Sequence, residues 1–376
     1  MKSRLIILLV IILFSGSCVT QFVPDIPEDK SLLVIEGMIT DQPEPNYIRL
    51  SMSMPIGKTY SAEPVEGATV KITDDLGNEY FLFEAKPGTY ATNQYSFRGI
   101  VGRKYSLHIQ THGSQTHSYS YESTPVELKP VPPIDSVYYD KVLVSGEPGK
   151  YNSVEACQIY VDSHDDSKQC SKYRWDYEET WEFRIPYEVP NKTCWKTEKA
   201  TAINIKNTTV LAEDRVSRYP LLLVTNETDR LSFRYSILVN QYSLSQDEYD
   251  YWEKLKSFTQ NIGGLYDIIP ASLTGNIFCV DDPAEKVLGY FSVSAKKSTR
   301  IFVNERFFGQ KSFYGFCATD TVYNGAPIPG LGQSVWIIED YSFPRRSPGF
   351  VVLTNYIQCY DCTVKGTNVK PWFWED

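Results

Sequence analysis

The sequence predicts a mainly β protein, in which an antiparallel β-sandwich precedes a larger β-rich domain with one amphipathic helix. Three observations support this prediction. Aromatic residues make up 14% of the 376 residues and include 27 tyrosines, and aromatic side chains fit the pleated, half-buried surface of a sheet. The 22 glycines and 22 prolines supply turns. Short segments with apolar residues at alternate positions lie between these turns.

The first 17 residues are typical of a secretory leader. After a short positively charged end, ten apolar residues run from Leu5 to Phe14, too few for a permanent transmembrane helix. Small residues then lead directly to Cys18. This arrangement resembles the processing site of bacterial lipoproteins, so we expect residues 1–17 to be a signal peptide and Cys18 to be acylated. Ordinary secretion with an incidental cysteine is the alternative.

Residues 18–30 are expected to form a tether, and the strand patterns follow it. The clearest pattern in residues 31–128 is Lys104–Gln110, in which every second side chain is apolar. Such segments, separated by short turns, predict an antiparallel β-sandwich. Residues 129–133 contain three prolines, which cannot continue a β-ladder, and are expected to link two domains. The other strand segments are Leu32–Gly37, Asn46–Met52, Val70–Thr73, Tyr80–Phe83 and Thr89–Ala91.

Residues 134–376 are expected to form the larger β-rich domain, with longer and less regular strand patterns. The segments are Val154–Val161, Lys172–Ile185, Thr201–Val210, Leu221–Val224, Ser232–Tyr242, Val287–Ser294 and Arg300–Val303. The last two segments are expected to pair as a hairpin around a short polar turn.

One amphipathic helix is predicted to begin after Ser245. Ser245 and Glu248 have the spacing of a capping box, in which the serine hydroxyl accepts a hydrogen bond from the Glu248 backbone N–H. Apolar and aromatic side chains then recur with helical spacing, and glycines 263 and 264 suit the end of a helix. We expect this stripe to pack on the β core of the second domain. It consists of Tyr249, Trp252, Leu255 and Thr259.

Composition and motifs argue against several functions. The chain has 37 basic and 46 acidic residues, and a net charge of −9 without a basic cluster argues against nucleic-acid binding. No apolar run after Phe14 is long enough to cross a membrane. The chain contains no G-x-S-x-G, P-loop or dinucleotide-binding glycine pattern. We therefore expect no catalytic residue, no metal site and no cofactor.

Seven cysteines remain besides Cys18, and disulfide bonds are the default in an exported protein. An odd number leaves at least one thiol free or paired with another chain. Cys157 and Cys170 flank a polar turn at residues 162–166. An antiparallel hairpin around this turn sets the two cysteines opposite each other, within reach of a disulfide. A bond between Cys170 and Cys194 is the competing pairing.

Cys359 and Cys362 are expected to form a disulfide, since no second cysteine or histidine pair accompanies them to complete a zinc site. His108 and His112 are expected to be surface histidines, because their spacing suits a metal only on a helix.

Two acidic groups are interpreted as structural. The first group is Asp162, Asp165 and Asp166. It lacks the spacing of a calcium loop and is predicted to be a solvated turn. The second group is Asp176, Glu178, Glu179 and Glu182, which resembles the carboxylate pairs of glycosidases. Because it alternates with aromatic residues, it predicts the polar outer face of a strand.

Several phrases, in their order and spacing, resemble a known family. They are Tyr173–Thr180, Arg234–Leu244, Leu273–Ile277, Val287–Phe291, Arg300–Val303, Cys359–Thr363 and Lys370–Trp374. The chain resembles, over nearly all of its mature length, the Bacteroidota outer-membrane lipoprotein family catalogued as domain of unknown function 4249. Pro64–Val70 and Gly88–Tyr90 are also similar to the prealbumin-like sandwich of carboxypeptidase regulatory-like domains, which implies an Ig-like or prealbumin-like sandwich for residues 31–128.

The family resemblance implies a location and a partner but no catalytic residue. Members are exported lipoproteins, often encoded beside TonB-dependent outer-membrane receptors. We therefore expect a lipid-anchored, non-enzymatic protein of the outer membrane, on either face, that acts as an accessory partner of such a receptor. The alternative is a surface lipoprotein acting alone, for instance a glycan-binding adhesin that uses exposed tyrosine and tryptophan side chains.

Overall fold

The computed structural model of the chain describes residues 31–53, 62–112, 118–146, 149–150, 152–211, 213–260, 273–311, 317–323, 326–341 and 349–375. The prediction of a mainly β protein is confirmed, because 50% of the described residues lie in strands and 8% in helices. The expected signal peptide, Cys18 and the tether lie outside the described residues, as does the glycine pair expected to end the helix.

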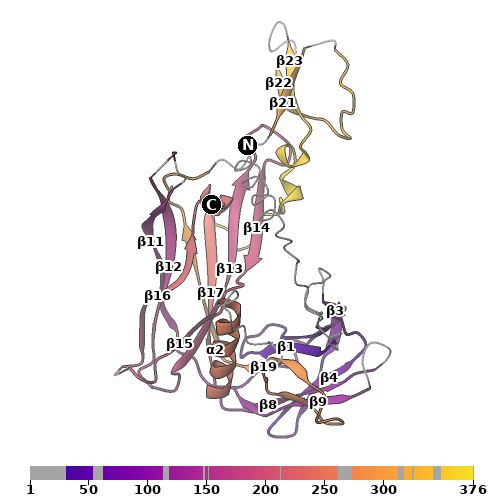
Figure 1. Cartoon of the computed structure of the whole chain (residues 1–376), viewed down its shortest axis with the longest axis vertical. Coiled ribbons are helices and arrows are strands. Elements are labelled where there is room, and N and C mark those ends of the chain that lie inside the picture. Colours follow the sequence, from indigo (N-terminus) through magenta and orange to yellow (C-terminus); the bar gives the residue numbers. More distant parts are fainter. Residues whose placement is uncertain are drawn as a thin grey trace, which may run out of the picture.

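Two six-stranded sheets form the N-terminal sandwich (Figure 1). Their alternate side chains fill the space between the sheets, as β8 (Lys104–Gln110) illustrates with buried Tyr105, Leu107 and Ile109. One sheet has the order β19–β1–β2–β7–β6 with β3 on β2, and the other has β18–β9–β8–β4–β5 with β10 on β8. The remaining strands are β1 Leu33–Ile39, β2 Tyr47–Met52, β3 Glu63–Pro64, β4 Thr69–Asp74, β5 Glu79–Phe81, β6 Phe83–Lys86, β7 Thr89–Ala91, β9 Ser120–Ser123, β10 Val126–Glu127, β18 Ile277–Cys279 and β19 Val287–Val293.

The N-terminal sandwich is not formed by residues 31–128 alone, which corrects the predicted domain boundary. β19 pairs in parallel with β1 along its whole length, and β18 pairs antiparallel with β9. β19 covers the edge of the sheet that β1 would otherwise leave open, and its own Phe291 and Val293 are buried there. The predicted hairpin is also wrong, because β19 joins this sandwich while β20 (Lys296–Val303) joins another sheet.

A second sandwich extends away from the first (Figure 1). Its sheets have the orders β11–β12–β16 and β14–β13–β17–β20, with β15 on β13. Apolar side chains of the two sheets form the core between them, among them Ile159 and Val161 from one sheet and Trp175 and Ile237 from the other. The strands are β11 Ile134–Ser145, β12 Ser153–His164, β13 Lys172–Arg184, β14 Thr193–Lys199, β15 Asn204–Asn207, β16 Arg215–Val224 and β17 Tyr235–Ser243.

The proline-rich segment 129–133 connects the two sandwiches and is fixed against β17. The Lys129 carbonyl accepts a hydrogen bond from Ser243 Oγ at 2.7 Å, and the Pro132 carbonyl accepts one from Gln241 Nε2 at 2.9 Å. Lys129 also forms a parallel bridge with Ser294 just after β19. The connection between the sandwiches is therefore held on both sides.

Helix α2 (Gln246–Gln260) lies where the two sandwiches meet (Figure 1). Its predicted cap is confirmed, since the Glu248 backbone N–H donates to Ser245 Oγ at 3.2 Å. The predicted stripe is corrected, because Thr259 is exposed and Tyr251 is the most buried apolar side chain of the helix. Tyr251 packs on Tyr290 of β19, so the helix covers a strand of the N-terminal sandwich.

Arg174 of β13 completes this junction from the side of the second sandwich. Its guanidinium lies 4.4 Å from the ring centroid of Trp252 and 4.9 Å from that of Tyr242. Trp252 Nε1 in turn donates to the buried Glu248 carboxylate at 3.3 Å. α2 thus contacts both sandwiches, and these stacked contacts fix it between them.

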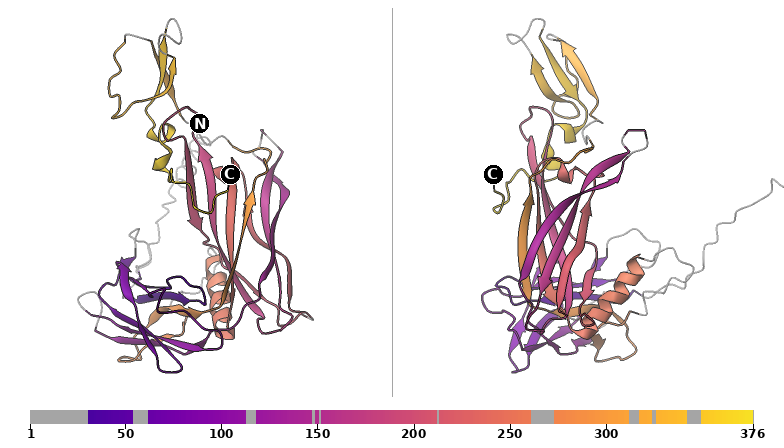
Figure 2. Two further views of the ribbon diagram at one scale, coloured as in Figure 1. Left: turned by 180° about the vertical axis from the view of Figure 1, so that it is seen from behind. Right: turned by 90° about the vertical axis from the view of Figure 1, so that its left-hand side faces the viewer.

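The chain ends in a small three-stranded sheet and a strap. The sheet, with the order β21–β23–β22, projects beyond the second sandwich (Figures 1 and 2). The strap, residues 371–374, returns to the outer face of β14–β13–β17–β20, where Arg300 lies 3.5 Å from the ring centroid of Phe373. The elements are β21 Thr319–Tyr323, β22 Trp336–Tyr341, β23 Phe350–Thr354 and the 3-10 turns η1 Asp229–Leu231, η3 Ile357–Cys359 and η4 Cys362–Val364.

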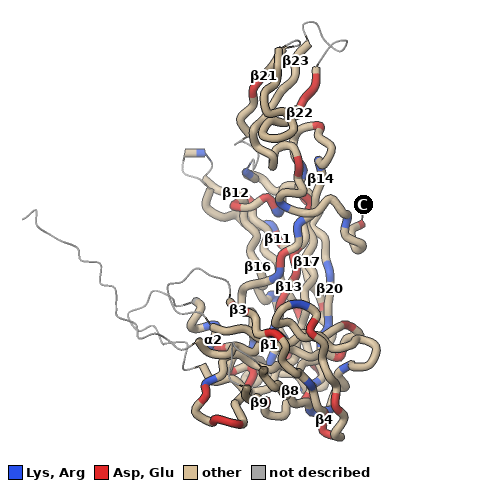
Figure 3. Tube along the Cα trace, turned by 90° about the vertical axis from the view of Figure 1, so that its right-hand side faces the viewer, with Lys and Arg blue, Asp and Glu red and all other residues tan. Residues whose placement is uncertain are grey.

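Charges are distributed along the whole molecule. Acidic and basic residues are interspersed over both sandwiches (Figure 3). Within the described part of the chain, no helix has the length and apolar character needed to cross a membrane.

Candidate functional site

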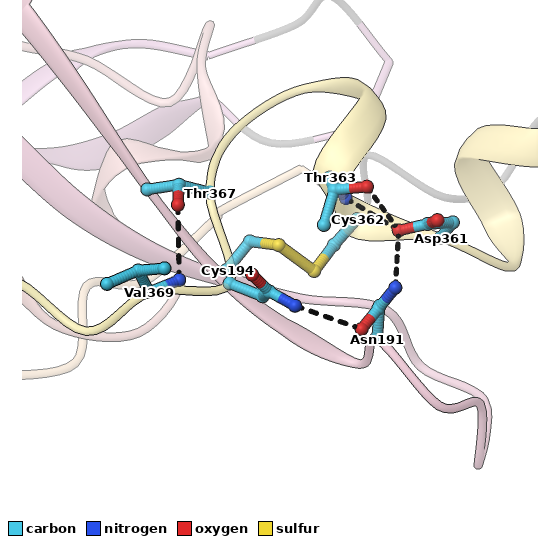
Figure 4. Close-up of a disulfide and its surroundings, with 8 residues drawn as sticks. Asn191, Cys194, Asp361, Cys362, Thr363, Thr367 and Val369 are labelled. Carbon is cyan, nitrogen blue, oxygen red and sulfur yellow. Dashed lines mark hydrogen bonds between the residues drawn. A yellow bond between two sulfur atoms is a disulfide. The ribbon is translucent and has the colours of Figure 1, made fainter.

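Two disulfide bonds fasten the C-terminal part of the chain. Cys317 bonds to Cys359, with Cα atoms 6.2 Å apart, and closes a loop that contains β21, β22 and β23. Cys194 of β14 bonds to Cys362, with Cα atoms 5.8 Å apart (Figure 4). We call the described residues from Cys317 to Cys359 the C-terminal module. It is closed at its base by one disulfide and joined to the second sandwich by the other.

The expected bond between Cys359 and Cys362 is wrong. Cys359 ends η3 and Cys362 begins η4, so the two residues lie on separate turns. Each is buried against a different element and bonds there to a distant cysteine.

The expected bond between Cys157 and Cys170 is also wrong, and so is the competing bond between Cys170 and Cys194. The Asp165 carboxylate accepts backbone N–H groups from Gln169 and Cys170, at 2.8 and 2.7 Å, and this turn leads the chain out of its sheet. β12 and β13 therefore lie in opposite sheets and form no hairpin. Cys157 and Cys170 are buried free thiols, and burial raises the pKa of each to about 12.

A polar network surrounds the bond between Cys194 and Cys362 (Figure 4). Asp361 Oδ1 accepts hydrogen bonds from the Thr363 backbone N–H at 2.9 Å and from Asn191 Nδ2 at 3.1 Å. Burial alone would raise the pKa of Asp361, but these hydrogen bonds outweigh it and lower the pKa. The C-terminal module is thus attached to the second sandwich by hydrogen bonds as well as by the disulfide.

The C-terminal module presents large apolar side chains to solvent. Ile338 and Leu353 form its small buried centre, while Tyr323 and Leu331 are about half exposed or more. The Tyr323 and Tyr341 rings both pack on Phe350, with centroids 6.1 and 4.9 Å apart. Aromatic side chains held in this way suit a protein-binding surface, because little side-chain freedom is lost on contact.

The four carboxylates of β13 do not act as one group. Asp176 and Glu178 lie on the outer face as predicted, where Asp176 accepts a hydrogen bond from Asn240 at 2.7 Å. Glu179 lies on the opposite, core-facing side and accepts a hydrogen bond from the Tyr235 hydroxyl at 2.7 Å. Burial raises the pKa of Glu179, and the Tyr235 hydrogen bond together with Arg230 at 3.2 Å offsets this only in part. Glu182 lies on the same face of β13 as Asp176 and Glu178, but it is buried there.

The other candidate ligands also have structural partners. His108 Nε2 lies 2.8 Å from Thr73 Oγ1, and His112 Nε2 lies 3.3 Å from Thr69 Oγ1. Asp165 is buried in its turn, so this part of the expected solvated turn is wrong. Among the residues that the structure describes, no three His, Cys, Asp or Glu side chains come together as a metal site would require.

Comparison with known proteins identifies the family. The model of the family described as domain of unknown function DUF4249 matches residues 19–300. The chain belongs to this family. The match to DUF4249 includes the N-terminal sandwich and most of the second one, and it ends within β20, at residue 300. The expectation that the resemblance extends to the C-terminal phrases therefore goes further than the match. No curated protein matches the chain.

The residues that build the C-terminal module of this DUF4249 protein were only partly visible in the sequence. The sequence offers Cys194 only as a partner of Cys170, and it offers no partner for Cys317. Sequence spacing gives no signal for either bond, because Cys194 and Cys362 are 168 residues apart. The grouping of cysteine with aromatic residues from Cys359 onward is the one sign in the sequence that this part of the chain is compact.

Proposed function

We propose that this DUF4249 protein is a lipid-anchored, non-enzymatic protein of the outer membrane of a Bacteroidota bacterium. In this proposal it acts as an accessory partner of a TonB-dependent receptor and binds that receptor through the C-terminal module. The leader before Cys18 supports the anchor, and the resemblance to exported lipoproteins supports the location.

The features of the projecting C-terminal module support the proposal of a protein partner. It stands apart from both sandwiches (Figure 2), and two disulfides hold it in place. Its exposed Tyr323 and Leu331 add nothing to the core of either sandwich. A rigid surface with exposed aromatic and aliphatic side chains is the kind that protein interfaces use as their energetic centre.

A pull-down from detergent-solubilised outer membranes tests this function. The wild-type protein is expected to retain a TonB-dependent receptor in stoichiometric amount. The double variant Tyr323→Ser/Leu331→Ser is expected to lose it. The matched control is Phe81→Ser/Phe83→Ser, which removes two exposed phenylalanines of the N-terminal sandwich and is expected to retain the receptor. Absence of a receptor from the wild-type sample contradicts the proposal. Equal retention of the receptor by both variants shows that the receptor does not bind through Tyr323 and Leu331 of the module.

The anchor gives a separate prediction. Cys18→Ala removes the acylation site, so the variant is expected to appear in the soluble fraction or to accumulate as unprocessed precursor. The several acyl chains of a bacterial lipoprotein give stable attachment, whereas one chain alone binds marginally. Partitioning of wild type and variant in a detergent phase separation measures this. A variant that enters the detergent phase like the wild type shows that Cys18 is not the anchor.

A further inference from the structure

The longer disulfide of this protein joins distant cysteines, while cysteines that are closer in the sequence stay unpaired. Cys194 bonds to Cys362, 168 positions away (Figure 4), and Cys279 between them is a free thiol. Cys157 and Cys170 are only 13 positions apart, and both are free thiols as well. The native pairing therefore differs from the pairing that short distances along the chain favour.

The wrong bond is favoured before the protein folds. The probability that two residues of an unfolded chain meet falls with roughly the 3/2 power of their separation. Cys157 therefore meets Cys170 about 50 times as often as Cys194 meets Cys362. An oxidant that acts on the unfolded chain consequently forms the bond between Cys157 and Cys170 first.

The bond between Cys157 and Cys170 is incompatible with the native fold. β12 runs on from Cys157 to His164, which is roughly 23 Å of strand at about 3.3 Å per residue. Beyond His164 the Cys170 backbone N–H donates to the Asp165 carboxylate at 2.7 Å, so Cys170 stays next to the far end of β12. A disulfide needs Cα atoms within about 7 Å of each other. A chain with this bond therefore cannot complete β12.

The bond between Cys170 and Cys194 is excluded in the same way. Cys194 lies opposite Phe183, near the end of β13, whereas Cys170 comes just before the first residue of that strand, Lys172. The strand from Lys172 to Phe183 is roughly 36 Å long. Oxidation between near neighbours therefore gives chains that cannot fold, and these bonds have to be broken before the native ones form.

We infer that this protein is a substrate of a thiol–disulfide isomerase, an enzyme with a reactive dithiol. One thiolate of the enzyme attacks Cys170 Sγ in the wrong bond and releases the Cys157 thiolate, and the second displaces Cys170 and leaves the enzyme oxidised. The Cys362 thiolate then attacks the enzyme disulfide. The Cys194 thiolate resolves this mixed disulfide and restores the enzyme dithiol. One bond breaks and one forms, so no net oxidant is consumed.

Folding ends the exchange. In the native protein Cys157, Cys170 and Cys279 are each at most 3% exposed. Burial raises the pKa of Cys157 and of Cys170 to about 12, so neither forms the thiolate that attacks a disulfide. The isomerase is therefore needed only until the protein has folded. The inference rests on the proposed export of the chain, because disulfides form outside the cytoplasm, but it is independent of the receptor.

Oxidative refolding of residues 18–376 with Cys18→Ala tests the inference without the anchor or the receptor. The reduced, unfolded chain is diluted into oxidised glutathione, with or without a catalytic amount of reduced protein disulfide isomerase. Non-reducing peptide mapping gives the fraction of chains with both native bonds. We expect the isomerase to raise this fraction at least fivefold, and we expect a linked peptide with Cys157 and Cys170 to dominate without it. Equal native fractions with and without the enzyme overturn the inference.

The variant Cys157→Ala/Cys170→Ala, made in the same chain, is the matched comparison. It keeps the cysteines of both native bonds and removes the near pair. We expect its native fraction in oxidised glutathione alone to be at least twice that of the parent chain, and its gain from the isomerase to be smaller. A variant that reaches the parent's native fraction with isomerase, but shows no advantage without it, overturns the inference as well. The comparison within the parent chain does not depend on how well the variant folds.

Discussion

Replacing Cys194 and Cys362 together by serine is expected to lower the free energy of unfolding by about 4–5 kcal/mol in the chain-entropy model. The bond joins residues 168 positions apart, so its loss greatly increases the freedom of the unfolded chain. Urea unfolding followed by tryptophan fluorescence measures the change. The transition of the second sandwich is expected to move to lower urea concentration.

The double variant Cys317→Ser/Cys359→Ser is the matched control. Its bond closes a much shorter segment, with a sequence separation of 42, and lies wholly within the C-terminal module. We therefore expect the module to become susceptible to protease while the main unfolding transition stays in place. Coincident main transitions for wild type and Cys194→Ser/Cys362→Ser would contradict the role assigned to the long-range bond.

Trp175→Ala is expected to destabilise the protein by about 3–5 kcal/mol, the range for truncation of a buried large aromatic side chain. Trp175 is 1% exposed and stacks on Tyr173, with ring centroids 5.7 Å apart. Its Nε1 donates to Gln241 Oε1 at 2.8 Å, so the substitution also leaves a buried acceptor without its donor. Chemical unfolding of the purified variant gives the value.

Trp372→Ala makes the same chemical change at a position that is 94% exposed. Its effect is expected to lie within about 0.5 kcal/mol, as for surface substitutions in general. A similar loss for both variants would mean that Trp372 contributes to the packing of the strap, whereas a small loss for Trp175→Ala would place its ring outside the core.

Local patterns in the sequence predicted local structure correctly. The alternation in Lys104–Gln110 reports which side chains face the core, and the Ser245 cap depends only on a residue three positions away. Pairings between distant segments leave no such pattern. The apolar run at Val287–Val293 predicts a strand but cannot indicate that its neighbour is β1 rather than β20.

The cysteine pairings failed for a related reason. The hairpin that placed Cys157 opposite Cys170 assumed that a polar turn returns the chain to the same sheet. The Asp165 carboxylate instead holds the following backbone N–H groups, and the chain crosses to the facing sheet. The left-handed conformation of Arg218 is equally hidden in the sequence, because it occurs without the glycine or asparagine that usually marks it.

The parallel pairing of β1 with β19 determines when the N-terminal sandwich can be completed during translation. A ribosome releases β1 early, but the strand that closes its edge begins only at Val287. Throughout the intervening translation the nascent chain carries an unfilled backbone ladder, the kind of surface that chaperones protect and that pairs with other chains. The N-terminal sandwich is thus the first part to appear, but it is completed only after β11 to β17 of the second sandwich have been made. A product that stops before residue 287 leaves its oldest strand permanently open to proteases.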